Sequence, residues 1–443
     1  MDYLLKNANV IDVKTGEYAI QDMIIVDGII KEIKPNIDDA FFDGTILNFA
    51  DKWILPGFID MHVHIKEGFA HLFTASGVTT VRNMAGSVTE LTEMINAPGC
   101  SATPRIYTAD RLIDGPPGIW GESSPYNINV NTVELARDEV RRQVDLGADL
   151  IKVYGWLERE VMQEVVDEAK KHNKEVSCDL LHSFQVNAVD AAQMGIRYNE
   201  HCSGIIQAIY PNWSMKSEQF EWDKIDWEHP PEDEIREICT KLVNENVVIC
   251  PTMIVFDQVN RLEQYWQVDN IVTEKMVQNK GLMQQWEFFL QHPESLKKTG
   301  IQKNWNQKIA KIYAELGGRV IAGTDSPAGI FNVPGMGLHR ELELFVEAGF
   351  TNLAAIQAAT IHAAEELGND QIGIIKEGAI ADLVVLNENP LKDINATREI
   401  FRIFKGGQQF EQEQLLALTP SAEEVMLKLE KFIAEFEETT HPL

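Results

Sequence analysis

Two histidines two residues apart, His62 and His64, end the run Ile-Leu-Pro-Gly-Phe-Ile-Asp-Met-His-Val-His at 54–64. Side chains two positions apart on a β-strand point to the same face. The apolar run therefore predicts a buried strand whose carboxyl end presents two imidazole nitrogens to one metal ion. Zinc binds such nitrogens at ~2.0–2.1 Å and, in catalytic sites, keeps one position open for water. Taken alone, the motif leaves two unrelated strand histidines as an equal alternative.

Four further residues that could bind a metal or move a proton lie in or just after strand-like runs: Lys152, His182, His201 and Asp325. Lys152 has apolar neighbours on both sides, where a free ammonium group is costly to bury. Either a carboxylate pairs with it, or its amine has reacted with carbon dioxide to give a carbamate that bridges two metals. A lone histidine at 182 or 201 is more often a packed or surface residue than a ligand. A carboxylate that ends a buried run, as Asp325 does, needs a metal or a hydrogen-bond donor.

The region from 57 to 368 alternates apolar strand-like runs with amphipathic helical segments such as 133–146 and 159–172. Repeated strand–helix units predict an α/β fold with parallel strands. About 250–300 residues of such units are typical of a (β/α)₈ barrel, which gathers its functional residues at the carboxyl ends of the strands. An open doubly wound sheet is the alternative, although no Gly-x-Gly-x-x-Gly motif opens a helix here.

The two ends of the chain share a different sequence pattern, in which short strand-like runs are separated by Gly and Asp turns. Asp27-Gly28 lies between two apolar runs and predicts a β-hairpin. Residues 369–415 return to the same pattern. We expect 1–56 and 369–415 to form one small β-sandwich domain beside the barrel.

We expect two further helical segments besides the barrel and the β-sandwich domain. Ser421 and Glu424 have the spacing of a capping box, which predicts a terminal helix within 416–443. A long helical insertion near 258–318 is expected to act as a lid or a subunit contact.

Composition narrows the class of partner. With 39 basic and 68 acidic residues, the formal net charge is −29, which argues against binding to nucleic acid or an anionic membrane. The five cysteines show no Cys-x-x-Cys spacing, so we expect neither a disulfide framework nor a thiolate zinc site. No signal peptide and no apolar stretch of ~20 residues is recognised. We expect a soluble, cytoplasmic protein that acts on a small molecule and could form a homo-oligomer.

The ordered motifs along nearly the whole chain give a family resemblance. The chain resembles the amidohydrolase superfamily, and within it the branch of imidazolonepropionase-like and prolidase-like (Xaa-Pro dipeptidase-like) metal-dependent hydrolases. The motifs that carry the resemblance lie at 54–64, 77–82, 147–152, 199–201, 323–325, 339–342, 358–364 and 378–386.

This resemblance implies a centre of two divalent metal ions, with zinc as the expected metal. The first ion would be held by His62, His64 and Asp325, and the second by His182 and His201. Carboxylated Lys152 would bridge the two. A hydroxide between the metals would be the nucleophile, because metal binding can lower the pKa of water from 15.7 toward ~7. Asp325 would act as general base and then as general acid.

Two positions depart from the family pattern. In relatives the fifth strand is followed directly by a histidine, whereas here Val176-Ser-Cys-Asp179 places an aspartate there and His182 three residues later. We expect His182 to be the ligand, with Asp179 as the competing candidate. Asn83 also stands where relatives often have an aspartate.

The expected activity is hydrolysis of an amide or peptide-like C–N bond, with dipeptides or N-acyl amino acids as substrates. A free substrate carboxylate would need a cationic or hydroxyl partner. The candidates, chosen by their place after strand ends, are Tyr154, Arg82, Tyr210 and His339. A structural role is at least as good an explanation for each of them.

Two other functions fit parts of the pattern. A mononuclear cyclic-amide hydrolase (imidazolonepropionase-like) or deaminase would need His62, His64, one later histidine and Asp325, with Lys152 unmodified. A non-catalytic scaffold could keep the fold without the chemistry, but scaffolds tend to lose ligands, and here nearly all of them match.

Overall fold

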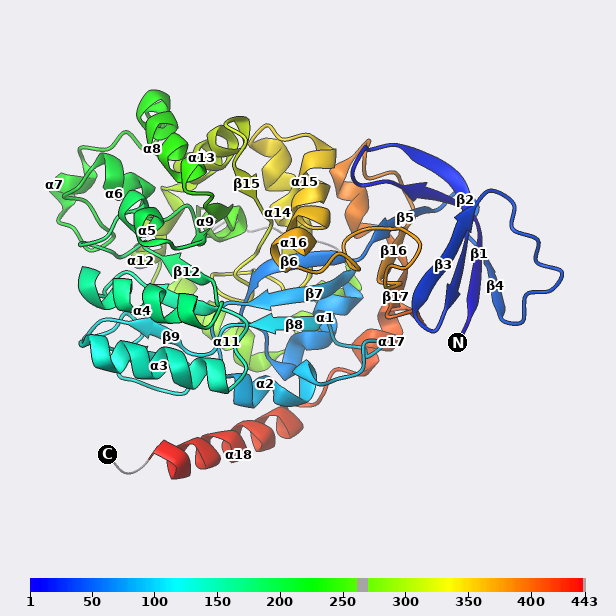
Figure 1. Ribbon diagram of the computed structural model, residues 1–443, viewed down its shortest axis with the longest axis horizontal. Helices are drawn as coiled ribbons and strands as arrows, with labels where there is room; N and C mark the ends of the chain where they lie inside the picture. Colours follow the sequence, from blue (N-terminus) through cyan, green and yellow to red (C-terminus); the bar gives the residue numbers. More distant parts are fainter. Residues whose placement is uncertain (261–269, 441–443) are drawn as a thin grey trace.

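The computed structural model describes residues 1–260 and 270–440. It places a barrel of parallel strands beside an eight-stranded mixed sheet, with helices around the barrel (Figure 1). Part of the insertion predicted near 258–318, residues 261–269, lies outside the described residues.

Two parallel sheets make the barrel, and backbone bridges join them at Val63–Ser326 and Ala109–Leu150. Among the described residues, the ring therefore consists of β6 (Phe58–Val63), β7 (Val78–Asn83), β8 (Arg105–Thr108), β11 (Ile151–Tyr154), β12 (Val176–Asp179), β13 (Tyr198–Glu200), β14 (Val248–Cys250) and β15 (Arg319–Val320). β9 (Leu112–Asp114) pairs with β11, and β10 (Asn127–Asn129) pairs with β9. The expected (β/α)₈ barrel is confirmed, and the open doubly wound sheet is excluded.

Amphipathic helices cover the barrel. α4 (Arg159–Lys171), for example, buries Val161, Val165 and Ala169 on one face, as its apolar spacing predicts. The other helices of the barrel region are η1 (Glu67–Phe69), α1 (Ala70–Ala75), α2 (Val88–Ile95), α3 (Val133–Asp145), α5 (Ala188–Met194), α6 (Ile205–Ile209), α7 (Gln219–Trp222), α8 (Glu232–Asn244), α9 (Met253–Asn260), α10 (Ile271–Met276), α11 (Lys280–Gln291), α12 (Glu294–Gly300), α13 (Lys303–Glu315), α14 (Met336–Glu347), α15 (Asn352–Ala358) and α16 (Ile361–Glu366).

The second sheet is built from both ends of the chain and forms the β-sandwich domain. Its strands are β1 (Tyr3–Ile11), β2 (Tyr18–Val26), β3 (Ile29–Lys34), β4 (Thr45–Asn48), β5 (Trp53–Pro56), β16 (Leu383–Leu386), β17 (Ile400–Lys405) and β18 (Gln408–Phe410). β16 pairs antiparallel with β5, which joins the C-terminal strands to the N-terminal ones. The predicted hairpin is present, with Asp27 and Gly28 at φ 51° and 77°, as a two-residue turn with positive φ requires. The exact domain boundaries stay a prediction.

Gly57 connects this sheet to the first barrel strand. Its N–H donates to the carbonyl of Asp382, and a Cβ at this position would lie 2.2 Å from the hydroxyl of Thr79. Only glycine leaves room for the side chain of Thr79 against the backbone at this position. The sandwich is therefore fixed directly to the strand that carries His62.

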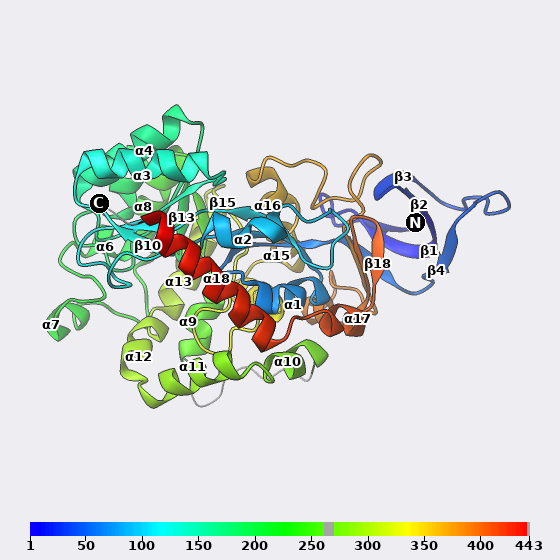
Figure 2. The same cartoon turned by 90° about the horizontal axis from the view of Figure 1, so that it is seen from below.

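The chain ends in two helices, α17 (Gln412–Ala417) and α18 (Ala422–Thr440), after η2 (Ile394–Arg398) in the sandwich region. Ser421 and Glu424 cap α18 reciprocally, as predicted. Figure 2 shows α18 lying across the outside of the barrel. Lys428 on α18 pairs with Glu67, which follows the first barrel strand, and with Glu93. Among the described helices, we find none with the length and apolar character needed to cross a bilayer.

A buried ion-pair network fastens α3 to the barrel and gives a pH-dependent stability. Glu139 accepts hydrogen bonds from Arg111 at 2.6 and 2.9 Å and from Arg142 at 2.8 Å. Burial acts against its ionisation, but these guanidinium groups lower the pKa of Glu139 to about 2. Because the folded pKa lies below the unfolded one, the stabilisation is complete above pH ~4.5 and is lost as the pH falls toward ~2.

We expect Glu139→Gln to lower the free energy of unfolding at pH 7 by about 3 kcal/mol, from ~1.4 kcal/mol per pKa unit. Urea unfolding at pH 7 and pH 3 checks this. The difference between wild type and variant should shrink to less than half at pH 3. An equal difference at both pH values would contradict the ionic role.

Candidate metal centre

The first group of candidate ligands meets where β6 ends and the segment after β15 begins. His62 is 1% exposed on a strand that is buried throughout, and His64 follows that strand directly. Oδ1 of Asp325 lies 3.2 Å from Nε2 of His62 and 2.8 Å from Nε2 of His64. The ligand atoms of these three side chains lie within 4.8 Å of one another. Two imidazoles and a carboxylate at this spacing suit one divalent ion such as zinc.

Asp325 is held in an unusual backbone conformation and kept ionised. Its φ is 60°, and that of His201 is 64°, a left-handed region that non-glycine residues rarely adopt and that is concentrated at functional sites. Burial opposes ionisation, but His62 and His64 hold the pKa of Asp325 well below its ordinary value. The carboxylate can therefore accept a proton at neutral pH.

A buried carboxylate orients His62. Nδ1 of His62 lies 2.7 Å from Oε2 of Glu200, so this nitrogen donates its N–H to the carboxylate. Glu200 is 0% exposed and also accepts from Arg82 Nη2 at 2.8 Å and from Ser177 Oγ at 2.7 Å. This contact turns Nε2 of His62 toward Asp325. Carboxylates that hold ligating histidines in this way are a common feature of metal sites.

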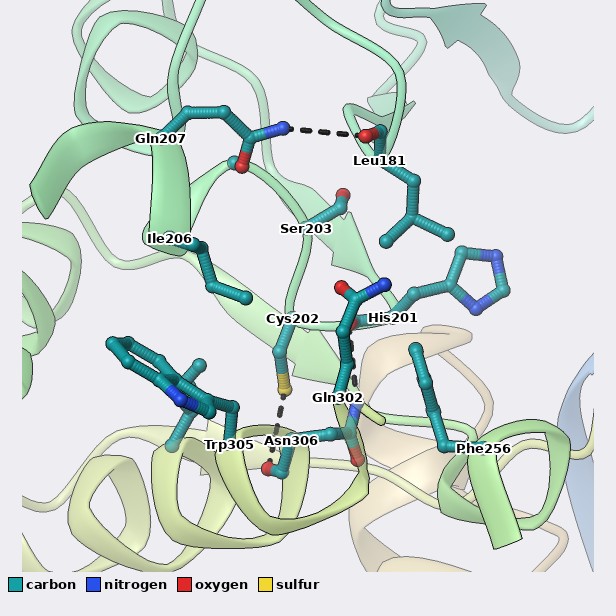
Figure 3. A pocket seen from close by; sticks show the side chains of 12 residues that line it. Leu181, His201, Cys202, Ser203, Ile206, Gln207, Phe256, Gln302, Trp305 and Asn306 are labelled. Carbon is teal, nitrogen blue, oxygen red and sulfur yellow. Dashed lines mark hydrogen bonds between the residues drawn. The ribbon is translucent and has the colours of Figure 1, made fainter. Parts of the chain in front are cut away.

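Two residues far from His201 in the sequence hydrogen-bond it and fix its position. Its Nδ1 lies 2.6 Å from the hydroxyl of Thr252, just after β14. Asn306 on α13 donates to the carbonyls of His201 and Pro251 at 3.1 and 2.9 Å. Figure 3 shows the imidazole of His201 pointing away from Cys202 and Trp305.

The imidazole of His201 is neutral and close to the first group. Its ring centroid lies 4.8 Å from that of His62. Burial, with the nearby charges of His62 and Lys152, lowers the pKa of His201 to about 4. A neutral imidazole whose Nδ1 already has a partner leaves Nε2 free to bind a metal.

Lys152 lies inside the barrel on β11 and is 1% exposed. Its Nζ has no hydrogen-bond partner among the described residues, and no carboxylate there lies within ion-pairing distance. Its charge acts on Glu200 and His201. Pairing with a carboxylate is therefore not how the structure accommodates this lysine. A buried amine without a partner fits a position that becomes a carbamate when the centre is loaded.

The fifth barrel strand ends at Asp179, and His182 lies on the turn beyond it. Tyr154 pairs with Asp179 in the β11–β12 register, two positions above Lys152 and Ser177. Because strand side chains alternate, Asp179 points to the same side as Ser177, which contacts Glu200 inside the barrel. Oδ2 of Asp179 lies 3.5 Å from Nε2 of His201. Neither Asp179 nor His182 belongs to a group of three close potential ligands among the described residues, and Nδ1 of His182 has no hydrogen-bond partner there.

Asn83 secures the chain segment that follows His64. Its Oδ1 accepts from the backbone N–H of Ile65 at 2.9 Å, and its Nδ2 donates to Thr108 Oγ1 at 3.1 Å. The amide therefore braces the loop at the first ligand pair without adding a charge.

The four candidates for binding a substrate carboxylate lie in different places. Tyr154 is at the carboxyl end of β11, where the charges of Asp179 and Asp325 act on it, and burial raises its pKa well above the ordinary value. Arg82 is buried and bonded to Glu200 and to the carbonyl of Met61.

The other two are not brought to the centre. Tyr210 packs its ring against Trp305. His339 contacts Thr397 and Ser76 through its two ring nitrogens and lies beside Phe58, at the amino end of β6.

His62, His64 and Asp325 thus fit one divalent ion, and further potential donors lie next to them. The potential donors comprise three imidazoles, two carboxylates and one buried amine without a hydrogen-bond partner among the described residues. Nδ1 of each imidazole is hydrogen-bonded or lies close to an acceptor. Sequence analysis gave no role to Glu200, Thr252 or Asn306. Of these three, only Glu200 could have been recognised in the sequence. Strand alternation predicts that its side chain points into the barrel, two positions after Tyr198.

Comparison with known proteins gives the family. The model of the amidohydrolase family matches residues 53–410. Ochratoxinase of Aspergillus niger is 24% identical over 382 residues, 76% of this chain and 66% of that protein. A dihydroorotase of Syntrophobacter fumaroxidans is 38% identical over 98 residues, so the matched segment spans 22% of that protein.

The fold is also that of solved structures. The structure of a Xaa-Pro dipeptidase with bound methionine has a TM-score of 0.69 and 21% identity, and the match covers 93% of this chain and all of that one. This likeness concerns the fold. Because the family model spans most of the sequence, this protein belongs to the amidohydrolase family.

Proposed function

We propose that this protein is a metal-dependent hydrolase that cleaves an amide or peptide C–N bond in dipeptides or N-acyl amino acids. The observation that carries the proposal is the grouping of His62, His64 and Asp325 around one space with the unpartnered amine of Lys152 beside His201. The likeness to a Xaa-Pro dipeptidase supports the class of substrate.

We assign each ligand from its position. His62, His64 and Asp325 would hold one ion, His201 the other, and carboxylated Lys152 would lie between them. For the ligand from the fifth strand we propose Asp179 in place of His182, because its carboxylate faces Nε2 of His201 at 3.5 Å.

The protein's own groups supply proton transfer and positioning. Divalent ions bound here would lower the pKa of a water molecule and polarise the scissile carbonyl. Asp325, ionised at neutral pH, would take the proton of the attacking water and deliver it to the leaving nitrogen. Tyr154 stays protonated because burial raises its pKa, so its hydroxyl can donate to an oxygen of the substrate. Glu200 and Thr252 keep two of the imidazoles in position.

A mononuclear cyclic-amide hydrolase is the second candidate. It is favoured by the fact that His62, His64 and Asp325 by themselves make a three-ligand site. It leaves the buried amine of Lys152 without a function, which is why we rank it second.

Substrate screening tests the proposal. Metal-loaded protein should release amino acids from Xaa-Pro dipeptides or N-acetyl amino acids, and a chelator should abolish this release. Activity on cyclic amides alone would support the second candidate. Two bound metals without hydrolysis of any of these classes would contradict both.

Paired substitutions decide the ligand of the fifth strand. We expect Asp179→Asn to lose about one of two metal equivalents, since an amide is a weaker ligand than a carboxylate. His182→Asn is the matched control and should keep both equivalents. Metal analysis of the two purified variants gives the answer. The opposite pattern would assign the position to His182.

A further inference from the structure

A pocket of about 300 Å³ lies at the end of the barrel where the strands that carry the candidate ligands end. It is lined by Pro116, Pro117, Gly155, Trp156, Phe184 and Gln185. These residues lie on the loops that follow β9, β11 and β12. In a barrel of this kind, the loops after the strands surround the substrate.

The pocket is tied by hydrogen bonds to the end of β9 and to the chain segment that follows β12. The indole Nε1 of Trp156 donates to the carbonyl of His182 at 3.0 Å, and its backbone N–H donates to Asp114 at 3.1 Å. Trp156 lies two residues after Tyr154, whose hydroxyl hydrogen-bonds the side chain of Trp120. One wall of the pocket is therefore held firmly next to Tyr154 and to the turn beyond Asp179.

The surface of the pocket region is apolar and aromatic. Phe184 is 59% exposed and Trp120 is 63% exposed. Leaving a large aromatic side chain such as Phe184 open to water at the rim of a pocket forgoes the gain of burying it, and such exposure is a feature of binding sites. Two prolines, Gly155 and one polar residue, Gln185, complete the lining. This shape and chemistry suit a large apolar side chain.

A lysine supplies the charge that such a substrate needs. Nζ of Lys216 lies 3.6 Å from the centroid of the Trp156 ring. Among the described residues, no carboxylate lies within ion-pairing distance of it, although the chain as a whole has a net charge of −29. Lys216 also lies close enough to act on His182 electrostatically. A cation held over an indole keeps its charge available to an anion.

We propose that this pocket binds the large apolar side chain of an N-acyl amino acid or dipeptide, and that Lys216 binds the free carboxylate of the same residue. The inference rests on the proposed function and adds the class of substrate. It assigns the carboxylate to a residue that sequence analysis did not select, in place of Arg82, Tyr210 and His339.

Three substrates separate the two contacts: N-acetyl-L-phenylalanine, N-acetyl-L-alanine and N-acetyl-L-phenylalaninamide, with acetate release as the readout. Phe184→Ala changes an exposed side chain, so the fold should be kept. We expect it to lower kcat/KM for the phenylalanine substrate about tenfold relative to alanine, as losses in apolar pockets do. Lys216→Met should lower kcat/KM about tenfold for both acids and leave the amide unchanged.

Lys224→Met is the matched control, because Lys224 is another exposed lysine near an aromatic ring, at 5.1 Å from Phe220. It should change none of the three rates. An unchanged phenylalanine-to-alanine ratio in Phe184→Ala would overturn the pocket. Equal losses for acid and amide in Lys216→Met would overturn the role of the lysine.

Failure of the proposed function gives a different result. If metal-loaded wild type hydrolyses none of the three, calorimetric titration with N-acetyl-L-phenylalanine tests the pocket directly. Binding that weakens about tenfold in Phe184→Ala would keep the pocket inference. No binding to wild type, or equal binding to both, would overturn it.

Discussion

Lys152→Met should remove at least one bound metal and lower kcat by more than the ~10–100-fold that loss of an outer-shell partner costs. The reason is the place of the amine: it is 1% exposed and has no hydrogen-bond partner among the described residues. As a carbamate it would carry the negative charge that two neighbouring cations require. Metal analysis and steady-state kinetics on the purified variant measure both effects.

The stability of the metal-free variant separates this role from a structural one. A buried amine without a partner costs free energy, so metal-free Lys152→Met should be at least as stable as metal-free wild type. A small carboxylic acid such as propionate should restore part of the activity of Lys152→Ala, because it can fill the space of the missing carbamate. A less stable metal-free variant that keeps both metals would show that the lysine only supports the fold.

Asp325→Asn should lower kcat by about 10²–10⁴-fold, the usual contribution of a positioned acid–base group. The amide keeps the size of the side chain but cannot take up the proton of the attacking water. It should also weaken binding of the ion shared with His62 and His64, whose Nε2 atoms lie 3.2 and 2.8 Å from Oδ1 of Asp325. Rates are to be measured at saturating zinc, so that lost metal and lost proton transfer are distinguished. A kcat within threefold of wild type under that condition would contradict the general-base role.

The part of the centre that could be predicted from sequence depends on local periodicity. Period two along a buried strand is enough to place His62 and His64 on one face. The strand-like runs at 150–154 and 198–201 locate the strand that carries Lys152 and the strand that His201 follows. The barrel follows from the repetition of such units. The same alternation would also have identified Glu200 as an inward residue.

The remaining contacts depend on residues distant in the chain, which periodicity does not reveal. Thr252 is 51 positions from His201, and Asn306 is 105 positions from it. Their partnership exists only because α13 and the end of β14 pack behind β13. His339 shows what position in the sequence alone leaves open. It belongs to a motif of the family pattern, and the structure places it at the amino end of β6 with hydrogen-bond partners at both ring nitrogens. Tyr210 is likewise placed against a tryptophan outside the centre.

The number of metal ions per chain tests the central claim most directly. It should be measured on protein produced with zinc and bicarbonate supplied and then freed of unbound metal. Two equivalents, falling to one or none in Lys152→Met, is the result that the arrangement of His62, His64, Lys152, His201 and Asp325 predicts. One equivalent that Lys152→Met leaves unchanged would contradict the binuclear centre and favour the mononuclear hydrolase.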